Sequence, residues 1–84
     1  MYQVIFTPNA KKQLSKLERD TQIRILKTLK RIRIRPESYL VKLIDDPSYK
    51  LRVEDYRLFI DIIENKLILL VLKVGHKKNI YKNP

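Results

Sequence analysis

The stretch from Lys50 to Gly75 constrains the fold most, because it consists of strand-like runs with very short joins between them. Strands joined by so few residues run antiparallel to their neighbours. We therefore expect a sheet built from consecutive hairpins. The expected strands are 48–53, 56–63 and 67–75, and the joins are Glu54-Asp55 and 64–66.

The side chains of these runs also predict how the strands pair. If Glu54-Asp55 is a two-residue turn, Arg52 faces Arg57, and if 64–66 is a three-residue loop, Arg57 faces Lys73. A shift of one residue would place charges on the apolar face. The face expected to be apolar carries Leu51, Val53, Tyr56, Leu58, Ile60, Ile62, Ile68, Leu70, Leu72 and Val74. The other face carries Lys50, Arg52, Arg57 and Lys73, with Phe59, Asp61, Ile63, Leu67, Leu69 and Val71 further along.

The first half of the chain predicts a strand and two helices. Residues 2–6 alternate as a strand, and Thr7-Pro8 is typical of a helix start, so a helix is expected over 8–17. A second helix is expected over 21–33, with Asp20 as its N-cap and Pro36 beyond its end. Its apolar stripe is Ile25, Leu29 and Ile32, widened by Ile23 and Leu26.

These elements predict an α+β fold. Its order is β-α-α-β-β-β, with an N-terminal strand and an antiparallel helix hairpin packed on one face of a mainly antiparallel sheet. Residues 1–84 are expected to form one domain. Leu40, Val41, Leu43 and Ile44 predict a packed connection before the sheet, and Asp45-Asp46-Pro47 predicts a turn. Gly75, the only glycine, is expected to permit a backbone conformation that other residues resist.

Charge narrows the choice of partner. Nineteen Lys and Arg residues against nine Asp and Glu residues give a formal net charge of +10. Such a charge favours polyanions, with nucleic acid first and an acidic protein second. Most basic residues of the two helices are expected to form a solvated face. No run of apolar residues is long enough to span a bilayer and no cysteine is present, so we expect a cytoplasmic protein that binds no membrane.

The basic end of the sheet carries groups that suit phosphodiester cleavage. This chemistry needs cations around the phosphate, and groups that take a proton from the attacking oxygen and give one to the leaving oxygen. Nothing has the spacing of metal ligands, so we expect no metal or other cofactor. The candidate cations are Lys50, Arg52, Arg57, Lys73, Lys77 and Lys78, and the candidate proton-transfer groups are His76 and Tyr81.

Short motifs along most of the chain add a resemblance. They are Tyr2–Thr7 with Ala10 and Gln13–Leu17, then Lys42-Leu43, Tyr49–Val53 and Asp55–Arg57, and finally Val74–Lys78 and Tyr81. In this order they resemble the RelE/ParE superfamily of type II toxins, and within it the RelE side. The resemblance implies an mRNA endoribonuclease that cuts the codon in the ribosomal A site. The 2′-hydroxyl would attack the adjacent phosphate and leave a 2′,3′-cyclic phosphate.

The resemblance also implies roles for individual residues. Arg57 would stabilise the charge of the phosphorane, and Lys50 and Arg52 would hold the phosphate and assist proton transfer. Tyr81 would stack on the nucleotide or activate it, and His76 matches relatives that close on Gly-His-Arg.

Two departures from the family pattern bear on the rate. Lys77 stands in place of a common Arg and loses the bidentate contact with phosphate. Arg52 stands in place of a common Lys and is a poorer proton donor or acceptor.

The resemblance further implies a RelB-like antitoxin whose acidic segments neutralise the basic surface. Three alternatives stay open: a ParE-like inhibitor of DNA gyrase, a non-catalytic nucleic-acid-binding module, and an inactive toxin remnant. The gyrase inhibitor would not need the set Lys50, Arg52, Arg57 and Tyr81.

Overall fold

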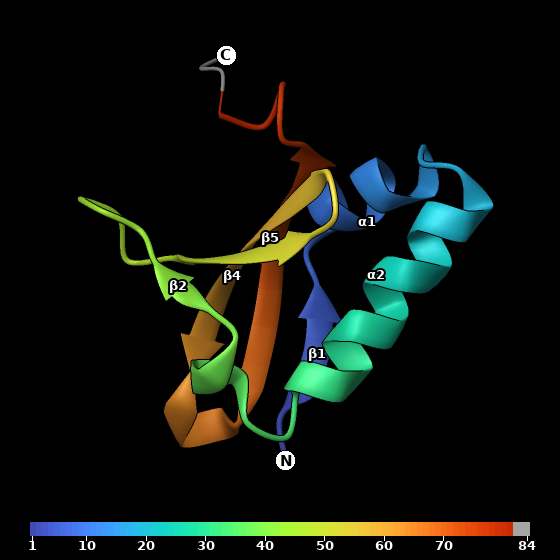
Figure 1. The fold of residues 1–84 in the computed structure, drawn as a ribbon. Coiled ribbons are helices and arrows are strands. Elements are labelled where there is room, and N and C mark those ends of the chain that lie inside the picture. Colours follow the sequence, from blue (N-terminus) through green and yellow to red (C-terminus); the bar gives the residue numbers. More distant parts are fainter. Residues whose placement is uncertain (82–84) are drawn as a thin grey trace.

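The computed structural model describes residues 1–81, and Figure 1 shows their fold. The α+β prediction is confirmed: two helices pack on a mixed sheet. In addition to the expected strands there is a short strand, β2, ahead of the central hairpins. The elements are β1 (Gln3–Phe6), α1 (Pro8–Ser15), α2 (Arg19–Ile32), the 3-10 helix η1 (Pro36–Ser38), β2 (Val41–Lys42), β3 (Tyr49–Val53), β4 (Tyr56–Ile63), the 3-10 helix η2 (Glu64–Lys66) and β5 (Ile68–His76).

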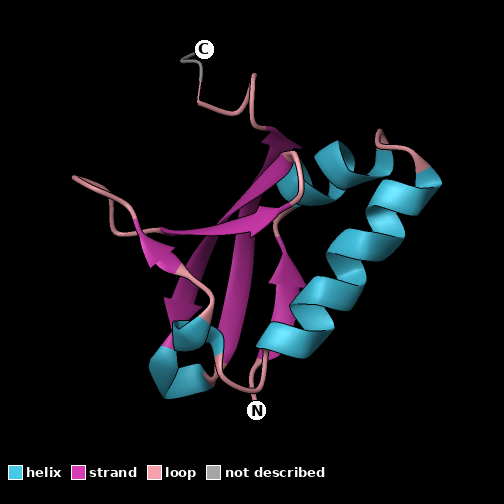
Figure 2. Cartoon of the chain, in the orientation of Figure 1, coloured by secondary structure: helices cyan, strands magenta, loops and turns pink. Residues whose placement is uncertain are grey.

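The sheet has the strand order β1-β5-β4-β3-β2. Strand β1 runs parallel to β5, and the other neighbours are antiparallel. Figure 2 shows both long helices on one side of the sheet, which leaves the other face, here called the open face, to the loops and the C-terminal segment. Within the described residues, no helix has the length and apolar character to cross a membrane.

The start of α1 and the buried stripe of α2 agree with the sequence. Thr7 caps α1, because its Oγ1 accepts a hydrogen bond from the Ala10 N–H (3.1 Å) and Pro8 follows it. The stripe Ile25, Leu29 and Ile32 of α2 is buried. The predicted start of α2 is wrong, since the helix begins at Arg19, with Glu18 in the N-cap position making no side-chain cap bond.

Two residues of α2 do not belong to the core. Ile23 and Leu26 were expected to widen its stripe, but both are exposed. Both lie outside the buried stripe, and Leu26 lines a surface hollow together with Phe6 of β1. The connection after α2 is similar: Leu40 is buried, whereas Ile44 is 90% exposed.

The turn that precedes β3 forms as predicted. Asp45 adopts a positive φ of 59° there. The backbone N–H of Ser48 donates to the Asp46 carboxylate (2.8 Å), and its hydrogen bonds lower the pKa of Asp46.

The β3–β4 hairpin has the predicted register. Val53 pairs with Tyr56 and Arg52 pairs with Arg57, and Leu51–Leu58 and Lys50–Phe59 continue the same register. The predicted two-residue turn is therefore confirmed. Glu54 adopts a positive φ of 52° in it.

The predicted β4–β5 register is wrong. Arg57 pairs with Gly75 rather than Lys73, and Ile63 pairs with Ile68 rather than Leu67. The loop is longer than expected because Leu67 takes a left-handed conformation after η2. A register shift between Phe59 and Ile60 then leaves Leu72 as the extra residue of a β-bulge.

The longer loop shifts the pairing by one residue and so reverses the faces predicted for the first half of β5, and the bulge restores them beyond Leu72. Leu69 and Val71 are 0% exposed and belong to the core, although they were assigned to the opposite face. Ile68, Leu70 and Leu72, which were expected in the core, are partly exposed. After the bulge the expected alternation returns, and Val74 is buried against Leu58.

Candidate active site

Two rows of side chains cross the open face at the centre of the sheet. Directly paired strand residues project to the same side, so the rows follow from the register. One row is Lys50, Phe59 and Lys73, and the next is Arg52, Arg57 and Gly75. The structure therefore brings the four predicted sheet cations onto one face, although Lys73 lies beside Phe59 instead of Arg57. Its Nζ is 5.7 Å from the centre of the Phe59 ring.

Arg57 is held in place by the β3–β4 turn. Its side chain is nearly buried, with the residue 7% exposed. Nη1 donates to the carbonyl oxygens of Glu54 (2.7 Å) and Tyr56 (2.9 Å). Because both bonds start from one nitrogen, Nη2 and Nε keep the donor pair that suits a phosphate. The turn thus orients the guanidinium before any substrate arrives.

The cations of the open face have no carboxylate partner among residues 1–81. The two ion pairs in this part of the chain are Arg24–Glu54 and Lys77–Asp55, and both involve the β3–β4 turn. Arg52 directly opposite Arg57 is a like-charge pair, which costs up to about 1 kcal/mol. The local excess of positive charge would be relieved by a bound anion.

The C-terminal segment folds back over the open face. Residues 77–81 form turns instead of the short extended segment expected at 79–81. Ile80 is buried, and it covers Gly75 at the end of the second row. The Tyr81 ring lies 5.9 Å from the Phe59 ring, and Lys50 Nζ lies 5.9 Å from the centre of the Tyr81 ring. Tyr81 therefore lies beside Lys50, and half of its surface stays exposed.

Gly75 serves a different purpose from the predicted one. It has no positive φ, so the expectation of an unusual backbone conformation is wrong. A Cβ at this position would lie 3.3 Å from Ile80 Cβ, which is tighter than an ordinary contact. The glycine leaves room for Ile80, which packs directly on the strand.

Replacing Gly75 with alanine should loosen this contact. We expect the Gly75→Ala variant to fold but to lose about 1 kcal/mol of unfolding free energy through overpacking. Nuclear Overhauser effects between the Tyr81 and Phe59 rings should weaken at the same time. The cost should shrink in an Ile80→Ala background, as a urea-based double-mutant cycle would measure. An unchanged Tyr81–Phe59 contact would contradict this role of the glycine.

His76 is not brought into the cluster. It pairs with Tyr56, whose side chain packs against the core on the helix side of the sheet. The two rings meet edge to face at 5.3 Å. His76 Nδ1 accepts a hydrogen bond from the Lys78 N–H (3.1 Å). This position makes His76 part of the turn that starts the C-terminal segment, and the expectation that it shares the site with Arg57 is wrong.

Of the two lysines that follow His76, Lys77 is tied to the β3–β4 turn beside Arg57. Lys77 donates its backbone N–H to the Asp55 carbonyl (2.7 Å), and its Nζ lies 3.4 Å from Asp55 Oδ1. Lys78 is exposed. Phe59 was not predicted to belong to the site, although the alternation of β4 placed it on the same face as Arg57; the observed register sets it between Lys50 and Lys73.

Comparison with known proteins decides the family. The model of the family described as "ParE toxin of type II toxin-antitoxin system, parDE" matches residues 4–81. The chain belongs to this toxin family. It is thus a type II toxin of the RelE/ParE superfamily, as the sequence motifs indicated. No curated protein sequence matches it.

Solved structures place this toxin beside RelE. The E. coli RelBE toxin–antitoxin complex is 25% identical over 90% of this chain and 96% of that chain, with a TM-score of 0.76. The Mycobacterium tuberculosis RelBE2 complex is 25% identical over 89% and 96%, with a TM-score of 0.78. The Pyrococcus horikoshii RelE–RelB complex shares the fold at 21% identity over 93% and 97%, with a TM-score of 0.77.

Proposed function

We propose that this toxin is an endoribonuclease that cuts mRNA in the ribosomal A site and so inhibits translation. The observation that carries the proposal is the cluster on the open face. There Arg57 is fixed by the turn, Lys50 and Arg52 flank it, and Tyr81 covers the neighbouring row. An inhibitor that acts by binding alone has no need of a pre-oriented guanidinium with an aromatic ring over the neighbouring row of side chains.

In the proposed reaction, side chains carry every step. The 2′-oxygen of the substrate attacks phosphorus, the bond from phosphorus to the 5′-oxygen breaks, and a 2′,3′-cyclic phosphate and a 5′-hydroxyl result. Arg57 stabilises the charge of the phosphorane, while Lys50, Arg52 and Lys73 hold the phosphate. One proton leaves the 2′-hydroxyl and one reaches the 5′-oxygen. Lys50 and Tyr81, which lie side by side in the cluster, are the groups assigned to carry them.

Lys77 and Lys78 assist from the edge of the cluster in this proposal. The Lys77–Asp55 ion pair is exposed at both ends, and such pairs contribute at most about 1 kcal/mol. A phosphate can therefore compete for Lys77. His76 has no chemical role in the proposal, because it lies on the other side of the sheet.

The proposed physiological partner is an antitoxin similar to RelB. The E. coli, M. tuberculosis and P. horikoshii structures are complexes of RelE with RelB. Acidic segments of such an antitoxin would cover the open face, whose cations lack carboxylate partners among the described residues. The proposed action on ribosomes also places the toxin in the cytoplasm.

A second candidate function is inhibition of DNA gyrase. The matching family model, which describes ParE toxins, favours it. A supercoiling assay separates the two candidates, since the ribonuclease should leave gyrase unaffected.

The deciding test is primer extension on a message translated by matched ribosomes. We expect discrete cuts within A-site codons when the toxin is added, and none when the ribosomes are omitted. Cuts that appear equally on free mRNA would contradict the dependence on the ribosome. The absence of any cut, together with relaxed DNA in the supercoiling assay, would replace the proposal with gyrase inhibition.

A further inference from the structure

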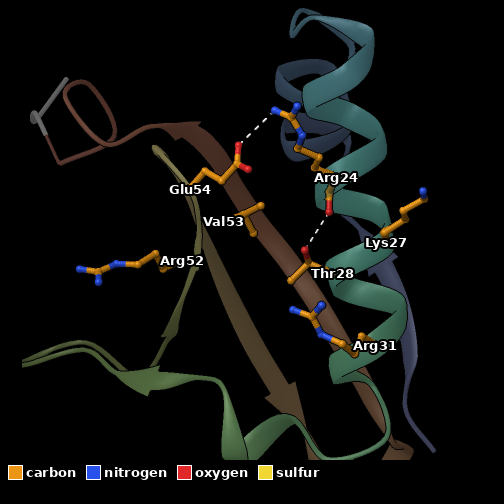
Figure 3. Close-up of a pocket in the computed structure, with 7 residues that line it drawn as sticks. All are labelled: Arg24, Lys27, Thr28, Arg31, Arg52, Val53 and Glu54. Carbon is orange, nitrogen blue, oxygen red and sulfur yellow. Dashed lines mark hydrogen bonds and ion pairs between the residues drawn. The ribbon is translucent and has the colours of Figure 1, made fainter.

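Three hollows surround the edge of the sheet at β3 and are linked by shared residues. The first, about 320 Å³, lies between α2 and the end of β3, and Figure 3 shows it. It shares Arg31 with a second hollow of about 370 Å³ beside η1. Tyr39 lines both the second and a third hollow of about 320 Å³, and Arg52 lines both the third and the first. Each hollow thus shares a lining residue with the other two, and the residues that line them are here called the edge surface.

Positive charge dominates the edge surface. Figure 3 shows Arg24 and Arg31 reaching from α2 toward β3, with Arg52 on the other side of that strand. Glu54 is the acidic residue of the first hollow, and Arg24 already holds it at 3.1 Å. Arg31, Arg35 and Arg52 make no ion pair within residues 1–81. These guanidinium groups are therefore available to phosphates.

An exposed aromatic ring stands between these cations. Tyr39 is about half exposed, and the Arg31 guanidinium carbon lies 6.0 Å from the centre of its ring. Cations spaced around an exposed ring suit a nucleic-acid strand, because phosphates meet the cations while an unpaired base stacks on the ring. An acidic peptide would use the charges but would gain little from the ring.

The edge surface also shares two residues with the candidate active site. Lys50 and Arg52 line the third hollow with Tyr39, and they belong to the two rows on the open face. A strand held at its cleaved phosphate by the open face can therefore continue over the edge of the sheet toward α2.

We propose that the edge surface binds the single-stranded RNA that flanks the cleaved nucleotide, with Arg31 and Arg35 on phosphates and Tyr39 stacked on a base. The assignment rests on the proposed ribonuclease function. It gives the basic face of α2, for which solvation alone was expected, a place in substrate binding. In this proposal the edge surface holds the RNA strand and the open face cuts it.

A non-cleavable probe tests this assignment apart from catalysis. The probe is a fluorescein-labelled 12-nucleotide RNA with 2′-O-methyl groups throughout, which leaves no hydroxyl to attack. The test variant is Arg31→Gln/Arg35→Gln, and the matched control is Lys16→Gln/Arg19→Gln, which removes two exposed charges near the connection of the helices. For the unaltered toxin, the logarithm of the affinity falls as the logarithm of the salt concentration rises. In the test variant this dependence should be less steep by about 1.4, at about 0.7 per lost phosphate contact. The control should keep the slope of the unaltered toxin.

A Tyr39→Ala variant tests the stacking part. It should weaken binding of the single-stranded probe by about 5- to 100-fold, and leave binding of the same sequence as a duplex unchanged. Thermal unfolding of every variant checks that the fold persists. If Arg31→Gln/Arg35→Gln and the control bind the probe alike, or if these residues affect only an acidic helical peptide, the inference is overturned. Because the probe cannot be cut, the binding result can be interpreted even if the toxin does not cleave mRNA in the A-site assay.

Discussion

The Arg57→Ala variant is expected to lose most of its A-site cleavage, by about 100- to 1,000-fold. That is the usual effect of removing one pre-oriented donor that stabilises charge in a transition state. The structure adds a reason: Nη1 is bound to two turn carbonyls, so the remaining nitrogens are held in a fixed direction. No other cation of the open face is fixed by hydrogen bonds of this kind within residues 1–81. Primer extension at saturating ribosomes measures the rate.

The same substitution should also lower stability, which the sequence alone did not indicate. Arg57 is nearly buried, and its loss removes two hydrogen bonds worth about 1 kcal/mol each. Ile25→Val is a suitable control, because Ile25 lies in the core on α2 and the change costs about 0.5–1.5 kcal/mol. If Ile25→Val loses cleavage as strongly as Arg57→Ala, the loss reflects stability rather than chemistry. Arg57→Lys should keep part of the activity, since it keeps the charge but not the planar donor pair.

The first hairpin could be predicted because charged residues alternate with apolar ones along it. In β3 and at the start of β4, one register alone keeps Arg52 and Arg57 off the apolar face, so the pattern fixes both the pairing and the faces. The same alternation placed Lys50 and Arg57 in the candidate site.

The second hairpin could not be predicted in the same way. From Leu67 to Leu72 every residue is apolar, so either set of alternating positions could face the core. The choice depends on the length of the loop at η2 and on the bulge at Leu72, which together place Leu69 and Val71 in the core. The face of His76 and the contact of Ile80 with Gly75 depend on how the strand continues into the C-terminal segment. These parts of the site could not be predicted from the local pattern of apolar and charged residues.

A matched pair of substitutions on β5 tests the bulge directly. Leu69→Ala should cost about 2–5 kcal/mol of unfolding free energy, because Leu69 is fully buried beneath the helices and its removal leaves a cavity. Leu70→Ala should cost about 1 kcal/mol or less, because Leu70 is partly exposed on the open face. The two residues are neighbours on the same strand and the chemical change is identical, so the two variants differ only in which face of the sheet is altered. Urea denaturation measures both values from the midpoint and slope. The opposite order would mean that the simple alternation of the strand holds in solution and that the bulge does not form.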